Sequence, residues 1–274
     1  MTIYSRLDRA VLKFSGKDAQ KLLNDVVTGP VAAEAGPARW WALLSAQGKI
    51  QAEGLIGWAE DAFWLDVHNS VADSFIKRMK MYRLRADMAI EDLRESHRLG
   101  WSAGPVDDGI VHADGRAAGL GFRVIADTGS AAGWATDAAV YDRARIAHGI
   151  AELGPDFALD TTFPHDIGMD LLNGVDFKKG CFIGQEVVSR MQHRGTARRR
   201  PVLVSGIDAE ASGPVMLGAR EVGALGAVLD GQSVAVLRID RIADATAVTV
   251  ADKPVTLALP SWASYSFGES VPAD

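Results

Sequence analysis

The chain has 274 residues, of which 48% are hydrophobic and 23% charged, and its formal net charge is −6. This composition is typical of a globular protein with one large or two to three small domains. No apolar run approaches the roughly 20 residues of a membrane-spanning helix, so we expect no membrane partner. The acidic balance argues against direct nucleic-acid binding. Since no apolar signal core opens the chain and cysteine occurs once, we expect a cytoplasmic location.

Residue patterns in the first half predict helices mixed with strands. Ser15 and Asp18 form a possible capping box for a helix that ends at Gly29-Pro30. Ser70 and Asp73 form a second possible box, before a helix whose spacing predicts a buried stripe of Val71, Phe75, Met79 and Tyr82. A third helix is predicted over residues 137–148. Apolar runs predict strands over 40–44, 55–58, 63–67, 88–93, 98–102 and 122–126.

The second half changes character twice. Residues 161–184 are rich in Gly, Asp and Pro, which predicts an ordered loop region, and helical spacing resumes over 185–191. Beyond Pro201, short runs with regular turn residues predict a small β-barrel or sandwich, with strands over 202–204, 226–229, 234–239, 247–250 and 255–259. The chain as a whole is therefore expected to be of the α+β class.

Cys181 is the only cysteine, so it cannot form an intrachain disulfide. Lys178 and Lys179 precede it and a helical pattern begins just after it, and cations and a helix N-terminus both favour a thiolate. The competing interpretation is a small buried hydrophobe, because free cysteine is often buried. A cysteine hydrolase would need a base, and His165 and His193 are the nearest histidines in sequence.

Common phosphate, dinucleotide and metal motifs are missing from the sequence. We therefore expect no metal site made by this chain alone, although Cys181 could supply one ligand to a shared iron–sulfur cluster. The basic run over 192–200, which includes Arg198, is either a solvated linker or a site for carboxylates. Glu53 interrupts an apolar strand and is either on an exposed strand face or catalytic. Glu186 and Asp166 are either acid–base groups or partners of a helix dipole.

The segment Lys179-Gly180-Cys181-Phe182-Ile183-Gly184-Gln185-Glu186 matches the Lys-Gly-Cys-Tyr/Phe-x-Gly-Gln-Glu signature of the YgfZ family. Members of that family are folate-binding proteins that resemble the aminomethyltransferase (T-protein) of the glycine cleavage system. The rest of the chain agrees with this resemblance in Ser15–Thr28, Gln47-Gly48-Lys49, Phe163-Pro164-His165-Asp166 and Arg190. The resemblance therefore spans most of the chain.

The resemblance implies a T-protein-like multidomain fold: an α+β folate-binding region over 1–195, in two interleaved subdomains, and a C-terminal β-barrel over 196–274. It implies a tetrahydrofolate-binding accessory protein for iron–sulfur cluster assembly or repair, including clusters of tRNA-modifying enzymes. Its partners would be folate and iron–sulfur assembly or client proteins. The alternative is a folate-dependent aminomethyl or one-carbon transferase. Glu53 departs from the Asp that relatives often carry, which argues for a non-enzymatic or weakly catalytic protein.

By the same resemblance, Cys181 is the candidate reactive residue, and it would carry a transient cluster or contact a partner. The candidate folate-binding residues are drawn from the signature, the basic run and the strand that would line the pocket: Lys178, Lys179, Gly180, Gln185, Glu186, Arg190, Glu53 and Arg198. The flat pterin of folate would stack on an aromatic ring, and its glutamate tail would meet cations. Seven tryptophans are available for stacking, and the sequence does not select among them.

Overall fold

The computed structural model describes residues 1–195 and 197–268, so residue 196 and residues 269–274 of the predicted barrel domain lie outside the described part. The chain forms two compact units. The first comprises Met1–Tyr141 with Leu172–Gln185, and the second comprises Asp142–Leu171 with Glu186–Asp274. Residues 142–171 and 186–195 thus belong to the same unit as the barrel, whereas the boundary expected from sequence lies at 195/196.

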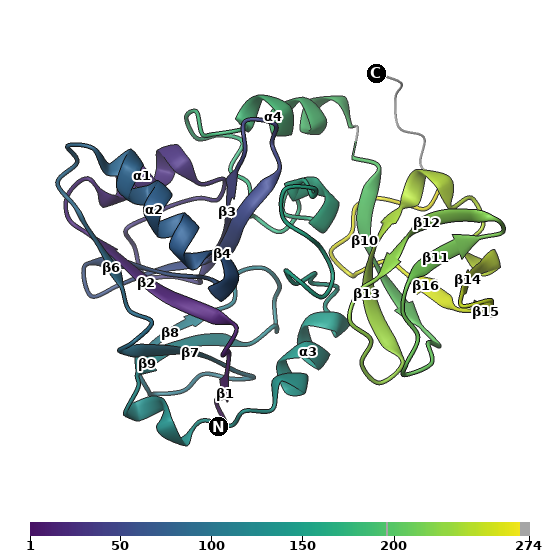
Figure 1. The fold of residues 1–274 in the computed structure, drawn as a ribbon, viewed down its shortest axis with the longest axis horizontal. Helices are drawn as coiled ribbons and strands as arrows, with labels where there is room; N and C mark the ends of the chain where they lie inside the picture. Colours follow the sequence, from purple (N-terminus) through teal and green to yellow (C-terminus); the bar gives the residue numbers. More distant parts are fainter. Residues whose placement is uncertain (196, 269–274) are drawn as a thin grey trace. The chain divides into compact units, whose positions relative to one another are not determined.

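The first unit is built on a five-stranded antiparallel sheet with helices on one face. The strand order is β3 (Arg39–Leu44), β4 (Ile50–Ala59), β5 (Ala62–His68), β2 (Arg9–Ser15) and β6 (Ala89–Asp92). Helices α1 (Ala19–Val26) and α2 (Ala72–Arg83) lie side by side on this sheet (Figure 1). Leu12 and Phe14 of β2 share a core with Leu23 of α1 and Phe75 of α2. Side chains that alternate along β2 therefore bury one face against the helices.

A second sheet covers the opposite face of the first. Its order is β1 (Tyr4–Ser5), β7 (His97–Ser102), β9 (Phe122–Asp127) and β8 (Ile110–Ala113). Val11 and Trp64 from the first sheet form a cluster with Leu99 and Ile125 from the second. Short 3-10 helices cover residues Asn69–Val71 and Ser130–Gly133. The unit thus has three layers, with helices, a five-stranded sheet and a four-stranded sheet.

Both predicted capping boxes are wrong. Asp18 is the N-cap of α1 but makes no capping hydrogen bond, and its carboxylate instead accepts from the backbone N–H of Asp87 at 2.7 Å. Helix α2 starts after a 3-10 turn, and Asp73 pairs with Arg94 at 2.6 Å. In each case a carboxylate near the helix start bonds to a segment distant in sequence. The predicted burial of Phe75 and Met79 is confirmed.

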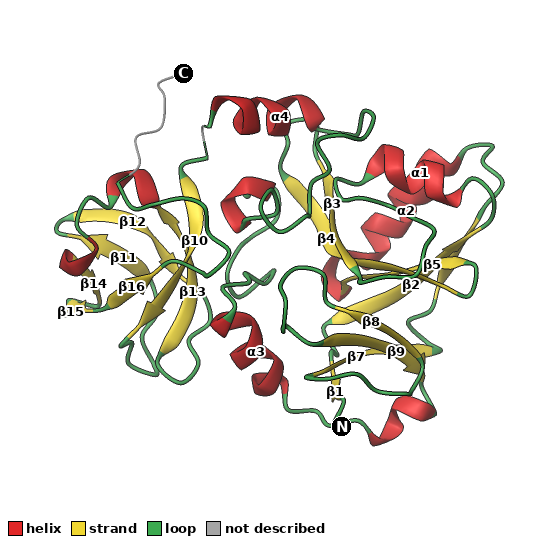
Figure 2. Cartoon of the chain, turned by 180° about the vertical axis from the view of Figure 1, so that it is seen from behind, coloured by secondary structure: helices red, strands yellow, loops and turns green. Residues whose placement is uncertain are grey.

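The C-terminal part of the second unit is a seven-stranded sheet that curls into a nearly closed barrel (Figure 2). The strands run in the order β15 (Lys253–Pro254), β14 (Val248–Val250), β11 (Pro214–Leu217), β12 (Arg220–Leu225), β13 (Gln232–Arg238), β10 (Arg199–Ser205) and β16 (Thr256–Ala258). Because β15 and β16 are consecutive in the chain, Val255 connects the two outermost strands. The strand predicted over 226–229 is wrong, since only Leu229 makes an isolated bridge there.

The remaining elements are α3 (Ala138–Ala147), α4 (Gln185–Arg194) and 3-10 helices at Pro164–Ile167, Ile239–Arg241 and Ala245–Ala247. Within the second unit, Trp262 donates from its indole N–H to the carbonyl of His148 at 2.7 Å. Arg200 on β10 pairs with Asp170 at 2.7 Å. These bonds attach residues 142–171 to the barrel. Across the described residues, no helix combines the length and the apolar character needed to span a bilayer.

Gly54 on β4 provides a test of the packing in the first unit. A Cβ at Gly54 would lie 1.9 Å from the backbone carbonyl oxygen of Asp66, whereas a Cβ at Gly36 would meet nothing within 4 Å. We expect Gly54→Ala to lower the free energy of unfolding by about 1–3 kcal/mol, because backbone must shift. Gly36→Ala, the matched control, should change it by less than about 0.5 kcal/mol in urea denaturation. Equal stability of the two variants would contradict this packing.

Candidate functional site

The loop that carries the cysteine signature is fixed to the first unit by Thr28. The Thr28 hydroxyl donates to the carbonyl of Gly174 at 2.7 Å and accepts from the N–H of Ala42 on β3 at 2.9 Å. The Thr28 carbonyl also accepts from the N–H of Asp176 at 2.9 Å. Thr28 is fully buried, so its hydroxyl depends on these partners. The loop therefore starts from a position that is set by the core of the unit.

Asp176 and Lys179 shape the next turn. The Asp176 carboxylate accepts from the backbone N–H groups of Lys178 and Lys179 at 2.9 and 3.2 Å. The Lys179 side chain turns inward, and its Nζ donates to the carbonyls of Val27 and Gly29 at 2.5 and 2.8 Å. Burial lowers the pKa of Lys179 to about 8, although Asp176 and Asp25 oppose the shift. The amine of Lys179 thus holds the loop in place.

Cys181 is exposed, whereas the residues after it anchor the loop. Phe182 is buried, and Ile183 packs against the core between helices and sheet. Gly184 has a φ of +77°, and a Cβ there would lie 2.5 Å from the carbonyl oxygen of Ser45. Only glycine suits that conformation and that approach. The alternative of a buried packing cysteine is therefore wrong: the thiol faces solvent from a loop tied down on both sides.

A cavity of about 420 Å³ lies beside this loop within the first unit. Its walls combine rings and apolar side chains with two cations, and they include Pro30, Arg39, Trp40, Asn173, Val175, Asp176, Phe177 and Lys178. The volume is in the range of about 300–1,000 Å³ that is usual for small-molecule pockets. Of the predicted folate-binding residues, Lys178 lines this cavity directly.

Glu53 is buried, with 4% of its surface exposed, so the prediction of an exposed strand face is wrong. One carboxylate oxygen accepts from the guanidinium of Arg9 at 2.8 Å. The other accepts from the indole N–H of Trp40 at 2.8 Å. Glu53 therefore fixes the ring of Trp40, and Trp40 in turn lines the cavity. Glu53 itself is not among the lining residues, so its carboxylate influences the cavity only by holding the Trp40 ring.

Glu53 belongs to a buried charge network between the two sheets, formed by Arg9, Glu53, Asp66 and Arg123. The Arg9 guanidinium pairs with Glu53 at 2.8 Å and with one carboxylate oxygen of Asp66 at 2.5 Å. The guanidinium of Arg123 lies 2.6 Å from the other Asp66 oxygen. Burial by itself would raise the pKa of Asp66, but Arg123 and Arg9 lower it below its usual value. All four side chains are almost fully buried. Charges so placed must stay paired, because removal of one partner costs about 3–5 kcal/mol.

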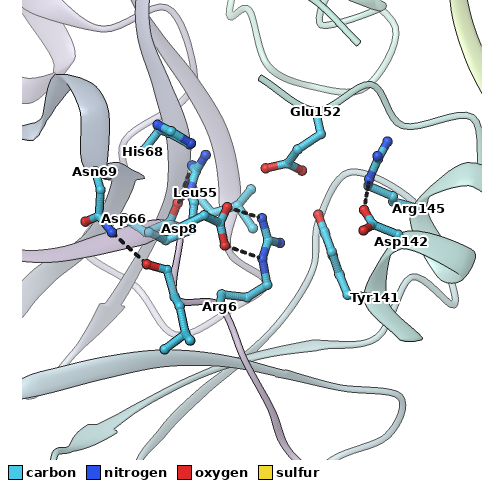
Figure 3. Close-up of polar contacts among 12 residues, drawn as sticks. Arg6, Asp8, Leu55, Asp66, His68, Asn69, Tyr141, Asp142, Arg145 and Glu152 are labelled. Carbon is cyan, nitrogen blue, oxygen red and sulfur yellow. Dashed lines mark hydrogen bonds and ion pairs between the residues drawn. The ribbon is translucent and has the colours of Figure 1, made fainter. Parts of the chain in front are cut away.

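Arg6 extends the cationic surroundings of Asp66. Its guanidinium donates two hydrogen bonds to the carboxylate of Asp8, at 3.0 and 2.8 Å (Figure 3). The same guanidinium lies 3.8 Å from the centre of the Tyr141 ring. Asn69 donates to the carbonyl of Leu7 at 2.7 Å and so holds the link between β1 and β2. In the second unit, Arg145 pairs separately with Asp142 at 2.6 Å.

The other predicted site residues are distributed over both units. Gln185, the first residue of α4, donates from its N–H to the carbonyl of Phe182 at 3.2 Å. In the second unit, Glu186 and Arg190 form an exposed ion pair one helical turn apart, at 2.8 Å. Arg198, in the same unit, is half-buried, and its carbonyl accepts from the N–H of Ile239 at 3.1 Å. Gly180 is exposed on the loop next to Cys181.

The acid–base and hydrolase candidates are engaged in local structure. The Asp166 carboxylate accepts from the backbone N–H of Phe163 at 2.9 Å. His165 is buried and lies 3.1 Å from the side-chain oxygen of Gln192, and burial lowers the pKa of His165. His193 is exposed on α4. The hydrolase hypothesis thus stays a prediction without support from these contacts.

Sequence reasoning selected only Lys178 from the lining of the cavity, and the polar and aromatic residues that it missed are Arg39, Trp40, Asn173, Asp176 and Phe177. A signal existed for Trp40. Trp40 and Trp41 are neighbours on a strand, so their side chains point to opposite faces. Trp41 packs in the helix-facing core, which leaves Trp40 for the other face.

The amine of Lys179 predicts a pH dependence of stability. The unfolded chain keeps this proton up to the ordinary pKa of 10.5, whereas the folded chain releases it near 8. Between these values the unfolded state binds more protons, so stability rises with pH, by about 3 kcal/mol at most. We expect wild type to gain stability over Lys179→Met from pH about 8 to about 10.5, measured by urea denaturation. The exposed Lys178→Met is the control, and a gap between wild type and Lys179→Met that is constant with pH would contradict the assignment.

Residues 197–265 match the family model "CAF17, C-terminal beta-barrel domain". The chain is 26% identical over 253 residues to a protein of Neosartorya fischeri named "Iron-sulfur cluster assembly factor IBA57 homolog, mitochondrial". It is 30% identical over 254 residues to a protein of the same name from Chaetomium globosum. These alignments cover 73% and 76% of this chain but only 57% and 58% of the two relatives. The chain thus spans less than two thirds of the length of the curated relatives it matches.

The fold has a close counterpart among solved structures. The aminomethyltransferase T of the glycine cleavage system from Bartonella henselae superimposes with a TM-score of 0.75. The match covers 97% of this chain and 87% of that chain, at 16% sequence identity. The chain therefore has the α+β fold of the aminomethyltransferase T-protein, completed by a barrel of the CAF17 C-terminal type, and it is similar in sequence to iron–sulfur cluster assembly factors.

Proposed function

We propose that this protein is a tetrahydrofolate-binding accessory factor in the assembly or repair of iron–sulfur clusters. The observation that carries the proposal is the exposed thiol of Cys181 on a loop that Thr28, Asp176, Lys179 and Gly184 hold in place. A thiol that only filled space would be buried. A solvent-facing thiol on a rigid support is suited to contact a metal cluster or a partner protein.

The cluster is cargo that Cys181 would share with a partner. Iron–sulfur clusters are usually held by several thiolates. Within residues 1–195 and 197–268, no group of three or more His, Cys, Asp or Glu side chains is placed to hold a metal ion. The other ligands would therefore come from an iron–sulfur assembly or client protein, including tRNA-modifying enzymes. The similarity to proteins named as iron–sulfur cluster assembly factors supports this role.

The cavity beside the loop fits the chemistry of a tetrahydrofolate. The half-buried Phe177 offers a ring next to which a pterin can lie, whereas Trp40 is 1% exposed and forms part of the cavity wall. Asp176 and Asn173 offer oxygens that accept from the N–H groups of a pterin. Arg39 and Lys178 supply positive charge for the carboxylates of the glutamate tail. Glu53 acts indirectly, by orienting Trp40. Direct folate contacts of Lys179, Gly180, Gln185, Glu186, Arg190 and Arg198 stay predictions.

Aminomethyl transfer is the less supported alternative. Both oxygens of the Glu53 carboxylate already accept from Arg9 and Trp40, so this carboxylate is committed to structure. If the protein formed methylenetetrahydrofolate from an aminomethyl donor, the transferase hypothesis would be supported instead. The cytoplasmic location stays a prediction, while the compared relatives are named as mitochondrial.

Replacement of Cys181 separates function from folding. Because the thiol is exposed, Cys181→Ser should change the free energy of unfolding by less than about 0.5 kcal/mol. In cells that lack the protein, the variant should fail to restore the activity of iron–sulfur enzymes. The control is Cys181→Ser combined with Ser212→Cys, which returns an exposed thiol outside the signature loop, in the second unit. Full restoration by Cys181→Ser would refute a role for the thiol.

Folate binding is tested by calorimetric titration with tetrahydrofolate. We expect saturable heat for wild type and about tenfold weaker binding for Lys178→Glu, because the reversed charge repels the glutamate tail. Lys17→Glu, an exposed site paired with Asp87, is the matched control and should bind like wild type. No heat at millimolar folate, or equal affinity of all three proteins, would contradict this assignment.

A further inference from the structure

The C-terminal end of α2 concentrates positive charge in an acidic chain. Residues 77–85 read Lys-Arg-Met-Lys-Met-Tyr-Arg-Leu-Arg, with five cations and no acid, although the whole chain has a net charge of −6. Lys77, Arg83 and Arg85 are exposed and pair with no carboxylate among residues 1–195 and 197–268. The helix dipole accounts for cations in the last turn, such as Arg83. It does not account for Lys77 or Arg85, which lie outside that turn.

Two large apolar side chains in the same stretch are exposed to solvent. Met81 is 63% exposed and Leu84 is 86% exposed. Only Met1 and Leu7 are comparably exposed large hydrophobic residues in the part of the chain that the structure describes. Met81 and Leu84 are three residues apart at the end of the helix. Both therefore add exposed apolar surface to the basic stretch 77–85.

The backbone at Leu84 adopts a conformation that is strained for a residue with a side chain. The N–H of Ala86 donates to the carbonyl of Arg83 at 2.7 Å, which closes a turn with Leu84 and Arg85 in the centre. Leu84 has φ 43° and ψ −103°. These angles match the first central position of a type II′ turn, where glycine is preferred. A bulky side chain there is a conformational cost of the kind that clusters at functional sites.

A groove that Met81 lines provides a receptor for an apolar side chain. Its volume is about 550 Å³, and its walls include Ile76, Lys77, Lys80 and Met81 of α2. The groove is also lined by Arg94 and by two acids that each pair with it at 2.6 Å, Asp73 on α2 and Asp92 on β6. Lys77 and Lys80 of α2 thus line the groove beside Ile76 and Met81, and neither forms an ion pair with a carboxylate among the described residues.

We propose that the α2 surface, made of Lys77, Lys80, Met81, Arg83, Leu84 and Arg85, docks an acidic segment of a partner protein that carries a bulky apolar side chain. Carboxylates of the segment meet the unpaired cations, and its apolar side chain packs on Met81 and Leu84 and enters the groove. The proposal rests on no part of the folate or Cys181 assignments.

Two other classes of partner fit this surface less well. A nucleic acid would need exposed aromatic rings for stacking, whereas Tyr82 is partly buried against the core. A flat anionic bilayer cannot keep its headgroups away from Asp73 and Asp92, which line the groove, whereas a peptide can place its apolar side chain there and its carboxylates at Lys77, Arg83 and Arg85. Charge complementarity together with the groove thus selects an acidic peptide.

A direct binding experiment uses a fluorescein-labelled peptide of glutamates around a central Leu-Phe pair. We expect salt-sensitive anisotropy changes with wild type, and shifts of the Met81 methyl resonance in NMR spectra. Lys77→Glu combined with Lys80→Glu should weaken binding by about tenfold or more. Arg220→Glu, an exposed site on β12, is the charge-reversal control and should bind like wild type. Cys181→Ser should also bind like wild type, which separates this surface from the proposed function.

Leu84→Gly tests the strained turn. Glycine adopts this conformation without strain, so the melting temperature should be unchanged or higher while peptide affinity falls several-fold. Absence of peptide binding to wild type, or equal affinity of the charge-reversed variant, overturns the proposal. Displacement of the peptide by phosphatidylglycerol vesicles or by oligothymidine also overturns it.

Discussion

The ion network of Arg9, Glu53, Asp66 and Arg123 is the constraint on which the first unit depends. It lies between two sheets, and each charge is compensated by a neighbour from another strand. The strands β2, β4, β5 and β9 must therefore adopt one register, because a slip would leave a buried charge without a partner. Since Glu53 also binds the indole of Trp40, the same network sets the wall of the cavity.

A second consequence concerns the cysteine loop. Thr28 and Lys179 attach this loop to the chain between α1 and β3, and β3 carries Trp40. The thiol and the cavity are therefore supported by the same part of the first unit. Rigid support costs little at the moment of binding, since no conformational freedom is lost then. An accessory factor that presents a thiol and holds a folate would gain from such preorganisation.

Much of the local structure followed from side-chain patterns. The strands at Trp40 and Phe63 and the stripe of Phe75 and Met79 were predictable, because periodic burial is encoded locally. Helix caps were not, since Asp18 and Asp73 bond to segments far along the chain. The short strands β11 and β12 escaped prediction because they pair with each other and with the barrel, and their own apolar pattern is weak.

By itself, the sequence determined the α+β class, a β-rich C-terminal region and the signature around Cys181. These properties depend on composition, period and short motifs, which are readable along the chain. Only the tertiary structure decided that Cys181 is exposed, that Lys179 turns inward and that Glu53 is buried against Trp40. Burial and pairing depend on residues that are distant in sequence and close in space, so adjacent lysines can have opposite surroundings.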